Sequence, residues 1–284
     1  MISIVICSRD PQTLSDVSQD VEATIGVPYE IIAIDNSQGK YGICAAYNAG
    51  AEQSKYDILC FMHEDIKFLT PNWGTIVVRT FQDKSIGAIG VAGSTYVPVA
   101  PCPWWETGES NNRTYISHTV EDTIQEKFYK NPNNESLSDV VVLDGVWICT
   151  RRRIWQQSPF DEKTFPEFHF YDVDFCSEVY KNHRVCVTFD ILIEHFSHGT
   201  LNSSWVKNAL KYYKKRSKEL PLGKTTYSEE EMKLINEALY IKFIYRLKEV
   251  SVKRKVIAKY VYNLFLLQPF KKDSLYHVKQ LLKR

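Results

Sequence analysis

The chain has 284 residues, of which 44% are hydrophobic and 24% are charged, and its formal net charge is +1. These values are ordinary for a globular protein of one large domain with room for an appendage. No segment approaches the ~18 uncharged apolar residues of a transmembrane helix, and the apolar start lacks the basic flank and cleavage site of a signal peptide. We therefore expect a cytoplasmic protein.

The charged residues are distributed unevenly along the chain. Residues 206–284 hold 20 Lys and Arg against 7 Asp and Glu, whereas residues 1–205 hold 15 against 27. This asymmetry predicts an acidic body that can bind cations and a basic tail that can bind an anionic surface.

The seven cysteines are scattered, without a C-x-x-C pair, which favours reduced core thiols over disulfides or zinc.

The first hundred residues alternate between apolar runs and helix-like stretches. The order predicts βαβ units and a mostly parallel, doubly wound sheet in an α/β fold. Thr70 and Pro71 resemble the N-cap and first turn of a helix. The expected strands are residues 2–7, 29–35, 58–62 and 85–93, and the expected helices are residues 12–25, 42–54 and 70–83.

Polar side chains follow each of the first three predicted strands. In doubly wound sheets, ligands bind at the carboxyl ends of the strands. Any one of these ends could be a solvated turn, but three in succession favour one shared site. The candidates are Ser8, Arg9 and Asp10 after the first strand, Asp35 after the second, and His63, Glu64 and Asp65 after the third.

Residues 94–139 break the pattern and are rich in proline, tryptophan and turn-forming residues. We interpret them as an insertion over the site. Trp104 and Trp105 could stack on a ligand or could pack within the loop.

Two further groups downstream carry chemistry. Asp172 and Asp174 lie near a predicted helix N-terminus, where the helix dipole favours carboxylates, and they point in different directions. A capping role is an alternative for Asp174. His195 and His198 end a strand-like run, and with Asp65 a histidine would form a mixed oxygen and nitrogen site for a divalent metal.

In order and spacing, these motifs resemble the GT-A-fold inverting glycosyltransferases of family 2, and within that family they look closer to the streptomycin-biosynthesis-type branch. The resemblance covers roughly residues 1–204. The motifs that carry it are "IVICSRD", "IIAIDNS", "YNAGAEQSKYDILCFMHEDI", "LDGVWICTRRRIW", "FDEKTFPEFHFYDVDFCSEVY" and "IEHFSHGT".

The resemblance implies a role for each matching residue. Asp172 would be the catalytic base, with Tyr171 in place of the glutamate that precedes it in the family. Asp65 would be the metal ligand of the Asp-X-Asp motif, but His63 replaces the first acid, which leaves the identity of the metal open. His195 would be the downstream metal ligand, with His198 as its rival.

The remaining predicted residues fall into two groups. Nucleotide binding is expected from Cys7, Ser8, Arg9, Asp35 and Glu64. Binding of the donor or acceptor sugar is expected from Asp144, Gly145, Trp147, Trp104, Trp105 and Asp174. The implied cofactor is Mn²⁺ or Mg²⁺, which would neutralise the departing diphosphate while a carboxylate deprotonates the acceptor hydroxyl.

The basic tail, residues 205–284, is predicted to be a helical extension. Ser228 and Glu231 form a capping box before a long helix. Basic amphipathic helices can lie on an anionic membrane, or the helices could pack on the acidic body or on a second copy of the chain. Nothing in the tail resembles a nucleic-acid-binding module.

The sequence therefore predicts a metal-dependent, hexosyltransferase-like enzyme with residues 1–204 as its GT-A domain. It would move a sugar from a nucleotide-diphospho-sugar, with UDP favoured, to a glycan or lipid-linked acceptor in cell-surface polysaccharide synthesis. Two alternatives stay open. One is a nucleotidyltransferase that makes the activated sugar, although "CSRDPQT" lacks the glycine-rich phosphate loop it would need. The other is a non-catalytic GT-A-like protein that binds glycans or partners.

Overall fold

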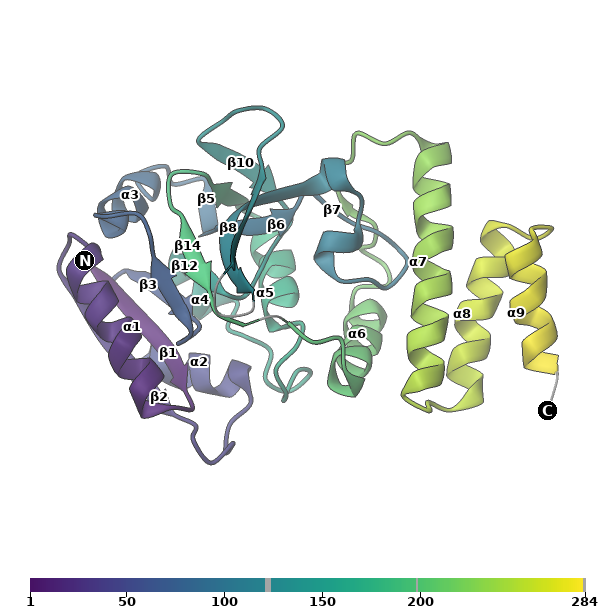
Figure 1. Cartoon of the computed structure of the whole chain (residues 1–284), viewed down its shortest axis with the longest axis horizontal. Helices are drawn as coiled ribbons and strands as arrows, with labels where there is room; N and C mark the ends of the chain where they lie inside the picture. The colour runs from purple at the N-terminus through teal and green to yellow at the C-terminus, as the bar shows by residue number, and fades with distance from the viewer. Residues whose placement is uncertain (121–123, 198, 283–284) are drawn as a thin grey trace.

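A computed structural model describes residues 1–120, 124–197 and 199–282, without the side chains of residues 120 and 124–126. A seven-stranded and a six-stranded sheet with covering helices make up most of the body, and three helices stand side by side at the end opposite β2 and α1 (Figure 1). The predicted α/β class is confirmed.

The larger sheet positions the carboxyl ends that the sequence singled out. Its strands are β1 (Ile2–Ser8), β2 (Tyr29–Asp35), β3 (Ile58–Met62), β5 (Ile86–Gly90), β10 (Leu137–Val140), β12 (Trp147–Arg151) and β13 (Arg184–Thr188). Their order is β10-β13-β5-β12-β3-β1-β2. β1 is parallel to β2 and β3, so these three strands end at one edge. The sheet is more mixed than the alternation predicts, because β12 runs antiparallel to β3 and β5.

Five helices belong to the body, and α1 is the one that begins at a side-chain cap. They are α1 (Pro11–Thr24), α2 (Ile43–Gln53), α3 (Trp73–Thr80), α4 (Arg152–Gln157) and α5 (Tyr171–Tyr180). At α1, the Asp10 carboxylate accepts the Thr13 N–H at 2.8 Å. Thr70 does not cap α3, because its hydroxyl accepts the Leu192 N–H instead. The helix starts after Asn72, which takes a left-handed conformation (φ 56°).

Residues 94–139 contain more regular structure than the sequence suggests. Their main part is a hairpin of β8 (Asn112–Val120) and β9 (Ile124–Lys130). β8 lies at the centre of a second sheet, in the order β11-β6-β8-β14-β4. The other strands of this sheet are β4 (Ile66–Phe68), β6 (Ala92–Ser94), β11 (Val142–Leu143) and β14 (Ile193–His195).

Smaller elements connect the sheets to the tail. β7 (Tyr96–Val97) pairs with β15 (Leu222–Gly223), and two short 3₁₀ helices, η1 (Trp104–Glu106) and η2 (Glu109–Asn111), precede β8.

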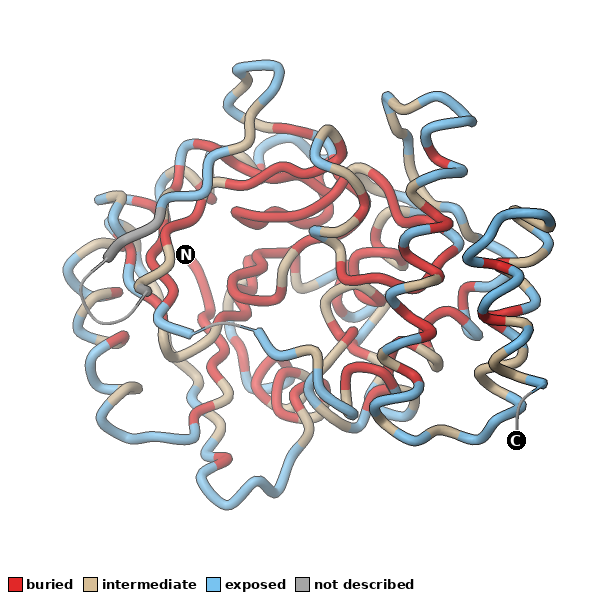
Figure 2. Tube along the Cα trace, turned by 45° about the vertical axis from the view of Figure 1, so that its right-hand side comes forward, coloured by how far each residue is buried: buried red, intermediate tan, exposed pale blue. Residues whose placement is uncertain are grey.

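The C-terminal helices are α6 (Ser203–Lys215), α7 (Glu229–Glu249), α8 (Arg254–Leu267) and α9 (Lys272–Leu282). The capping box of Ser228 and Glu231 is present at the start of α7. Trp205 and Tyr212 of α6 belong to the same buried cluster as Phe61 of the main sheet. Figure 2 shows buried residues concentrated in the central strands and many exposed positions on the terminal helices. Within the described residues, no helix is both long and apolar enough to cross a membrane.

Candidate active site

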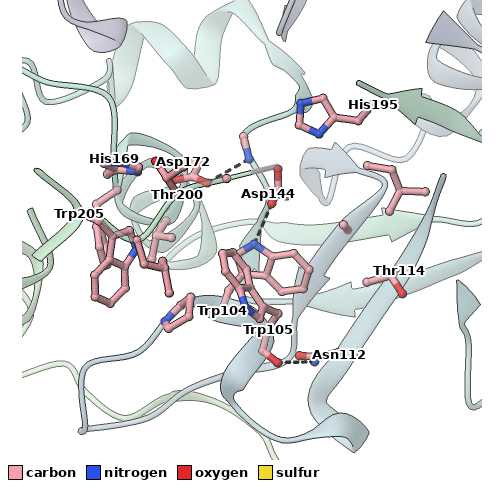
Figure 3. A pocket seen from close by; sticks show the side chains of 18 of the residues that line it. Trp104, Trp105, Asn112, Thr114, Asp144, His169, Asp172, His195, Thr200 and Trp205 are labelled. Atoms are coloured by element: carbon pink, nitrogen blue, oxygen red, sulfur yellow. Dashed lines mark hydrogen bonds between the residues drawn. The ribbon is translucent and has the colours of Figure 1, made fainter. Parts of the chain in front are cut away.

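A cavity of about 540 Å³ opens where the two sheets meet the start of α5 (Figure 3). Its wall includes His63, Asp144, Asp172 and His195, which come from four separate segments of the chain. The fold therefore brings groups that are far apart in the sequence to one hollow.

His63, Asp65 and His195 form a compact group; the two histidines line the cavity, and Asp65 is not part of its lining. One ligand atom from each lies within 4.8 Å of the others. Asp65 Oδ1 is 3.9 Å from His63 Nδ1 and 3.5 Å from His195 Nε2. The antiparallel pairing of β14 with β4 places His195 opposite Ile66, directly beside Asp65. Two imidazole nitrogens and one carboxylate oxygen form a donor set suited to a divalent transition metal, so the residues fit the implied ion.

Electrostatics favour the ligating forms of His63 and Asp65. Burial, together with the nearby His195, lowers the pKa of His63 to about 4, so its imidazole is neutral at pH 7. Burial alone would raise the pKa of Asp65, but the hydrogen bond and the electrostatic interaction with His195 hold this pKa well below its usual range. Asp65 is therefore ionised.

Asp172 lies in the first turn of α5, facing the cavity. The preceding Phe170 takes a left-handed conformation (φ 69°), uncommon for an aromatic residue, and this turn starts the helix. Burial, followed by the negative charge of Asp144, raises the pKa of Asp172 to about 7. A carboxylate that titrates near neutral pH is suited to accept a proton from a hydroxyl.

The loop of residues 144–146 forms hydrogen bonds with both Asp172 and His63. The Gly145 N–H donates to Asp172 Oδ2 at 3.0 Å, and the Val146 carbonyl accepts the His63 N–H at 3.0 Å. Both carboxylate oxygens of Asp144 are engaged: Oδ2 accepts the Trp104 Nε1–H at 2.9 Å, and Oδ1 accepts the Val146 N–H at 2.9 Å. Asp144 therefore orients the Trp104 side chain and the Val146 backbone.

Aromatic side chains form the outer wall of the cavity. Trp104 and Trp105 pack edge to face, with ring centroids 5.6 Å apart, and Trp105 is 43% exposed. Phe168 and Trp205 complete the wall. Figure 3 shows Asp144 between Asp172 and the two tryptophans. The apolar faces of sugar rings fit such a surface.

The predicted nucleotide-binding residues lie outside the cavity wall, along the neighbouring strand ends. Ser8 of β1 pairs with Asp35 of β2. The Glu64 carboxylate accepts the Arg9 N–H at 2.9 Å and so ties the end of β3 to the end of β1. The Cys7 sulfur accepts a hydrogen bond from Asn36 at 3.4 Å. These five predicted residues therefore lie on neighbouring strand ends. Glu64 holds two of these ends together through its hydrogen bond to Arg9.

Two predicted sugar-binding residues do not line the cavity. Trp147 is fully buried in the core, where its ring packs against Trp73 at 6.1 Å. Asp174 is 3% exposed and points toward α6, where Lys215 Nζ and Arg216 Nη2 contact its carboxylate at 2.7 and 2.6 Å. These two assignments are corrected: Trp147 is a core residue, and Asp174 anchors α6. His198, the rival metal ligand, lies outside the described residues.

The sequence missed the contribution of β8. Asn112, Thr114, Ile116 and His118 alternate along this strand, and all four line the cavity. His118 pairs with His195 across the two strands, and their ring centroids are 5.4 Å apart. Residues 112–118, N-R-T-Y-I-S-H, do not alternate between apolar and polar side chains, so periodicity offered no signal for this strand.

A glycosyltransferase-like family matches residues 3–221. The chain belongs to this family. The match extends through α6, which the ion pairs of Asp174 also join to the body. No relative among curated proteins matches the sequence.

Solved GT-A glycosyltransferases share the fold at low sequence identity. The mannosyltransferase PcManGT from Pyrobaculum calidifontis, in complex with GDP-Man and Mn²⁺, has a TM-score of 0.52 and 10% identity over 99% of this chain and 84% of its own. S. aureus TarS with UDP has a TM-score of 0.51 and 10% identity over 94% and 81%. GalNAc-T7 with UDP, GalNAc and Mn²⁺ has a TM-score of 0.51 and 12% identity over 88% of this chain, which spans 56% of the GalNAc-T7 chain. The predicted GT-A fold is confirmed.

Proposed function

We propose that this glycosyltransferase-like protein moves a sugar from a nucleotide-diphospho-sugar to an acceptor hydroxyl, with a bound divalent metal and with inversion at the anomeric carbon. The observation that carries the proposal is that two histidines of a group able to bind a metal and a carboxylate with a pKa of about 7 line the same cavity.

His63, Asp65 and His195 would hold the metal, and Mn²⁺ suits their mixed donor set better than Mg²⁺. When bound, the ion supplies neutralisation of a diphosphate's charge. Structural relatives in complex with Mn²⁺ and a nucleotide or nucleotide sugar support this choice. Ser8, Arg9 and the neighbouring strand ends would hold the nucleotide, in line with the ligand position typical of such sheets.

Asp172 would accept the proton of the acceptor hydroxyl as that oxygen attacks. Inversion follows from a single displacement that needs one base and no carboxylate nucleophile. The other carboxylate of the wall, Asp144, is poorly placed as a nucleophile because both of its oxygens already accept hydrogen bonds.

The nucleotidyltransferase alternative is disfavoured by the first turn of the fold. Only Arg9 and Asp10 separate β1 from α1, and Asp10 already caps that helix. A phosphate-cradling loop at this position would need more residues and glycine. The non-catalytic alternative has no such geometric objection, and it predicts that no nucleotide sugar is turned over.

The acceptor is proposed to be a glycan or lipid-linked glycan at the inner face of a membrane, with the C-terminal helices in peripheral contact. Lys255, Lys259, Tyr262 and Leu266 follow one stripe of α8, and both apolar members are 60% exposed. Phe270, at 89%, stands two residues before the exposed Lys272. Basic and aromatic side chains grouped in this way suit an anionic lipid surface.

Packing of the tail on the body engages some of its other cations. Arg216 and Lys215 bind Asp174, and Arg246 binds Glu106 at 2.9 Å. In contrast, Lys255 and Lys259 make no ion pair with a described carboxylate.

The experiment that tests the proposed function measures release of nucleoside diphosphate from a panel of UDP-, GDP- and dTDP-sugars, with Mn²⁺ or with EDTA. Release from one donor class that requires Mn²⁺, and is faster than in buffer, supports the transferase. No release from any donor, with or without metal, would favour the non-catalytic alternative.

A further inference from the structure

The hydroxyl of Tyr171 lies between His63 and the backbone of Gly145. Its oxygen is 3.1 Å from His63 Nε2 and 3.0 Å from the Gly145 carbonyl oxygen. A carbonyl oxygen can only accept, so the single hydroxyl proton of Tyr171 goes to Gly145. Toward His63, the tyrosine oxygen is therefore the acceptor, and His63 Nε2 carries a hydrogen.

This hydrogen-bond order determines which nitrogen of His63 can bind a metal. A neutral imidazole protonated on Nε2 has its lone pair on Nδ1, and Nδ1 is the atom that lies 3.9 Å from Asp65 Oδ1. Histidine ligands are commonly oriented in this way by a hydrogen bond to their other ring nitrogen.

We propose that Tyr171 is a positioning residue of the metal site, which holds His63 with Nδ1 directed at Asp65 and His195. The inference rests on the metal site of the proposed function. It joins the two departures from the family motif: His63 replaces an acid, Tyr171 replaces a glutamate, and the two replacements contact each other. A carboxylate at position 63 needs no acceptor to fix a tautomer, whereas an imidazole does.

The surroundings hold the tyrosine in place. Its ring is 4% exposed and packs against Tyr47 and Phe160, with centroid distances of 5.7 and 6.0 Å. A Cβ at position 145 would lie 2.0 Å from the Tyr171 hydroxyl oxygen, so only glycine admits this contact. The backbone of Gly145 also binds Asp172, and it therefore links the metal group to the base.

The test is Tyr171→Phe, assayed by Mn²⁺ binding rather than by turnover. We expect the dissociation constant for Mn²⁺, measured from the EPR signal of the free ion, to rise about 10- to 100-fold. Pulsed EPR of the bound ion should show loss of one of the two coordinated imidazole nitrogens. The matched control is Tyr212→Phe, which removes an equally buried hydroxyl that hydrogen-bonds Ser177 at 2.8 Å and should leave Mn²⁺ binding unchanged.

A double-mutant cycle separates positioning from general destabilisation. If Tyr171 acts through His63, adding Tyr171→Phe to His63→Ala should not weaken Mn²⁺ binding further. Gly145→Ala crowds the hydroxyl without removing it and should shift Mn²⁺ affinity in the same direction, which covers the case that Tyr171→Phe does not fold.

Retention of both nitrogens and of Mn²⁺ affinity within about two-fold in Tyr171→Phe would overturn the inference, as would an undiminished effect in the His63→Ala background. A wild-type protein that binds no Mn²⁺ would instead overturn the metal site of the proposed function, and this inference with it.

Discussion

Asp172 and Gly145 are joined by a hydrogen bond of 3.0 Å from the glycine N–H to the aspartate Oδ2, across 27 residues of sequence. The bond fixes the direction of a carboxylate whose burial raises its pKa to about 7. Orientation and basicity are the two properties that a base for hydroxyl activation requires.

Replacement of this carboxylate tests its role. Asp172→Asn keeps the shape and can still accept the Gly145 N–H, but it cannot take a proton at neutral pH. We expect sugar transfer to fall by about 10²- to 10⁴-fold, while binding of the nucleotide and of Mn²⁺ stays near the wild-type value. Initial rates with the donor found in the panel, together with nucleotide titration, measure both. A variant within a few-fold of wild-type activity would remove Asp172 from the reaction.

The pH dependence of the rate follows from the raised pKa. Because the base must be ionised, activity should rise with pH on a limb centred near 7. Asp144→Asn removes the negative charge that contributes to the shift, so the limb should move to lower pH while the amide oxygen still accepts from Trp104. An unmoved limb in Asp144→Asn would show that this limb does not belong to Asp172.

Loss of the Asp65 charge should abolish the response to metal. Mn²⁺ binding to the native state stabilises it by mass action, so Mn²⁺ should raise the melting temperature of the wild-type protein. In Asp65→Asn, affinity for Mn²⁺ should fall by more than about 100-fold, since even outer-shell partners of a metal ligand account for 10- to 100-fold. Asp16→Asn, an exposed position on α1, is the control. An equal Mn²⁺ shift in both variants would contradict the assignment of Asp65.

The buried ion pair between α5 and α6 should matter for stability. Arg216 is 1% exposed on its side chain and contacts Asp174, Glu178 and Glu219. Arg216→Ala leaves the buried Asp174 carboxylate with Lys215 as its remaining cation, and the free energy of unfolding in urea should fall by about 3 kcal/mol. Lys242 forms an ion pair with Glu106, and its side chain is 54% exposed. Lys242→Ala should therefore change the free energy of unfolding by less than about 1 kcal/mol. Equal effects would contradict a specific role for Arg216.

Contact with a membrane is tested at the most exposed apolar side chain of the tail. Phe270→Asp should reduce co-sedimentation with phosphatidylserine-containing vesicles by several-fold, because it removes apolar contact and adds like charge to an anionic surface. Tyr129→Asp, at a 51% exposed aromatic of the body, should not. Binding that is absent in the wild-type protein, or unaffected by Phe270→Asp, would favour the alternative that the tail packs on protein alone.

The sequence predicts the parts of the site that depend on chain order. The carboxyl ends of parallel strands lie at the same edge of a sheet, so Ser8, Asp35 and Asp65 could be grouped from the sequence. Motif resemblance added His195, and the antiparallel pairing of β14 with β4 explains why it meets Asp65.

Other assignments failed because local patterns do not state which way a side chain points. β12 is buried on both faces, so alternation could not show that Trp147 faces the core. Asp174 lies two residues after Asp172, on another side of α5, and its partner Arg216 is distant in sequence. The contact of Tyr171 with His63 spans 108 residues, and no periodicity reports such a pair.

The most direct test of the central claim is calorimetric titration of UDP, GDP and dTDP into the protein with Mn²⁺ and with EDTA, repeated with Asp65→Asn. The account predicts that one nucleotide binds the wild-type protein only when Mn²⁺ is present and binds Asp65→Asn in neither condition. Binding that is equally tight in EDTA, or no binding of any nucleotide with Mn²⁺, would contradict a metal-dependent nucleotide-sugar transferase.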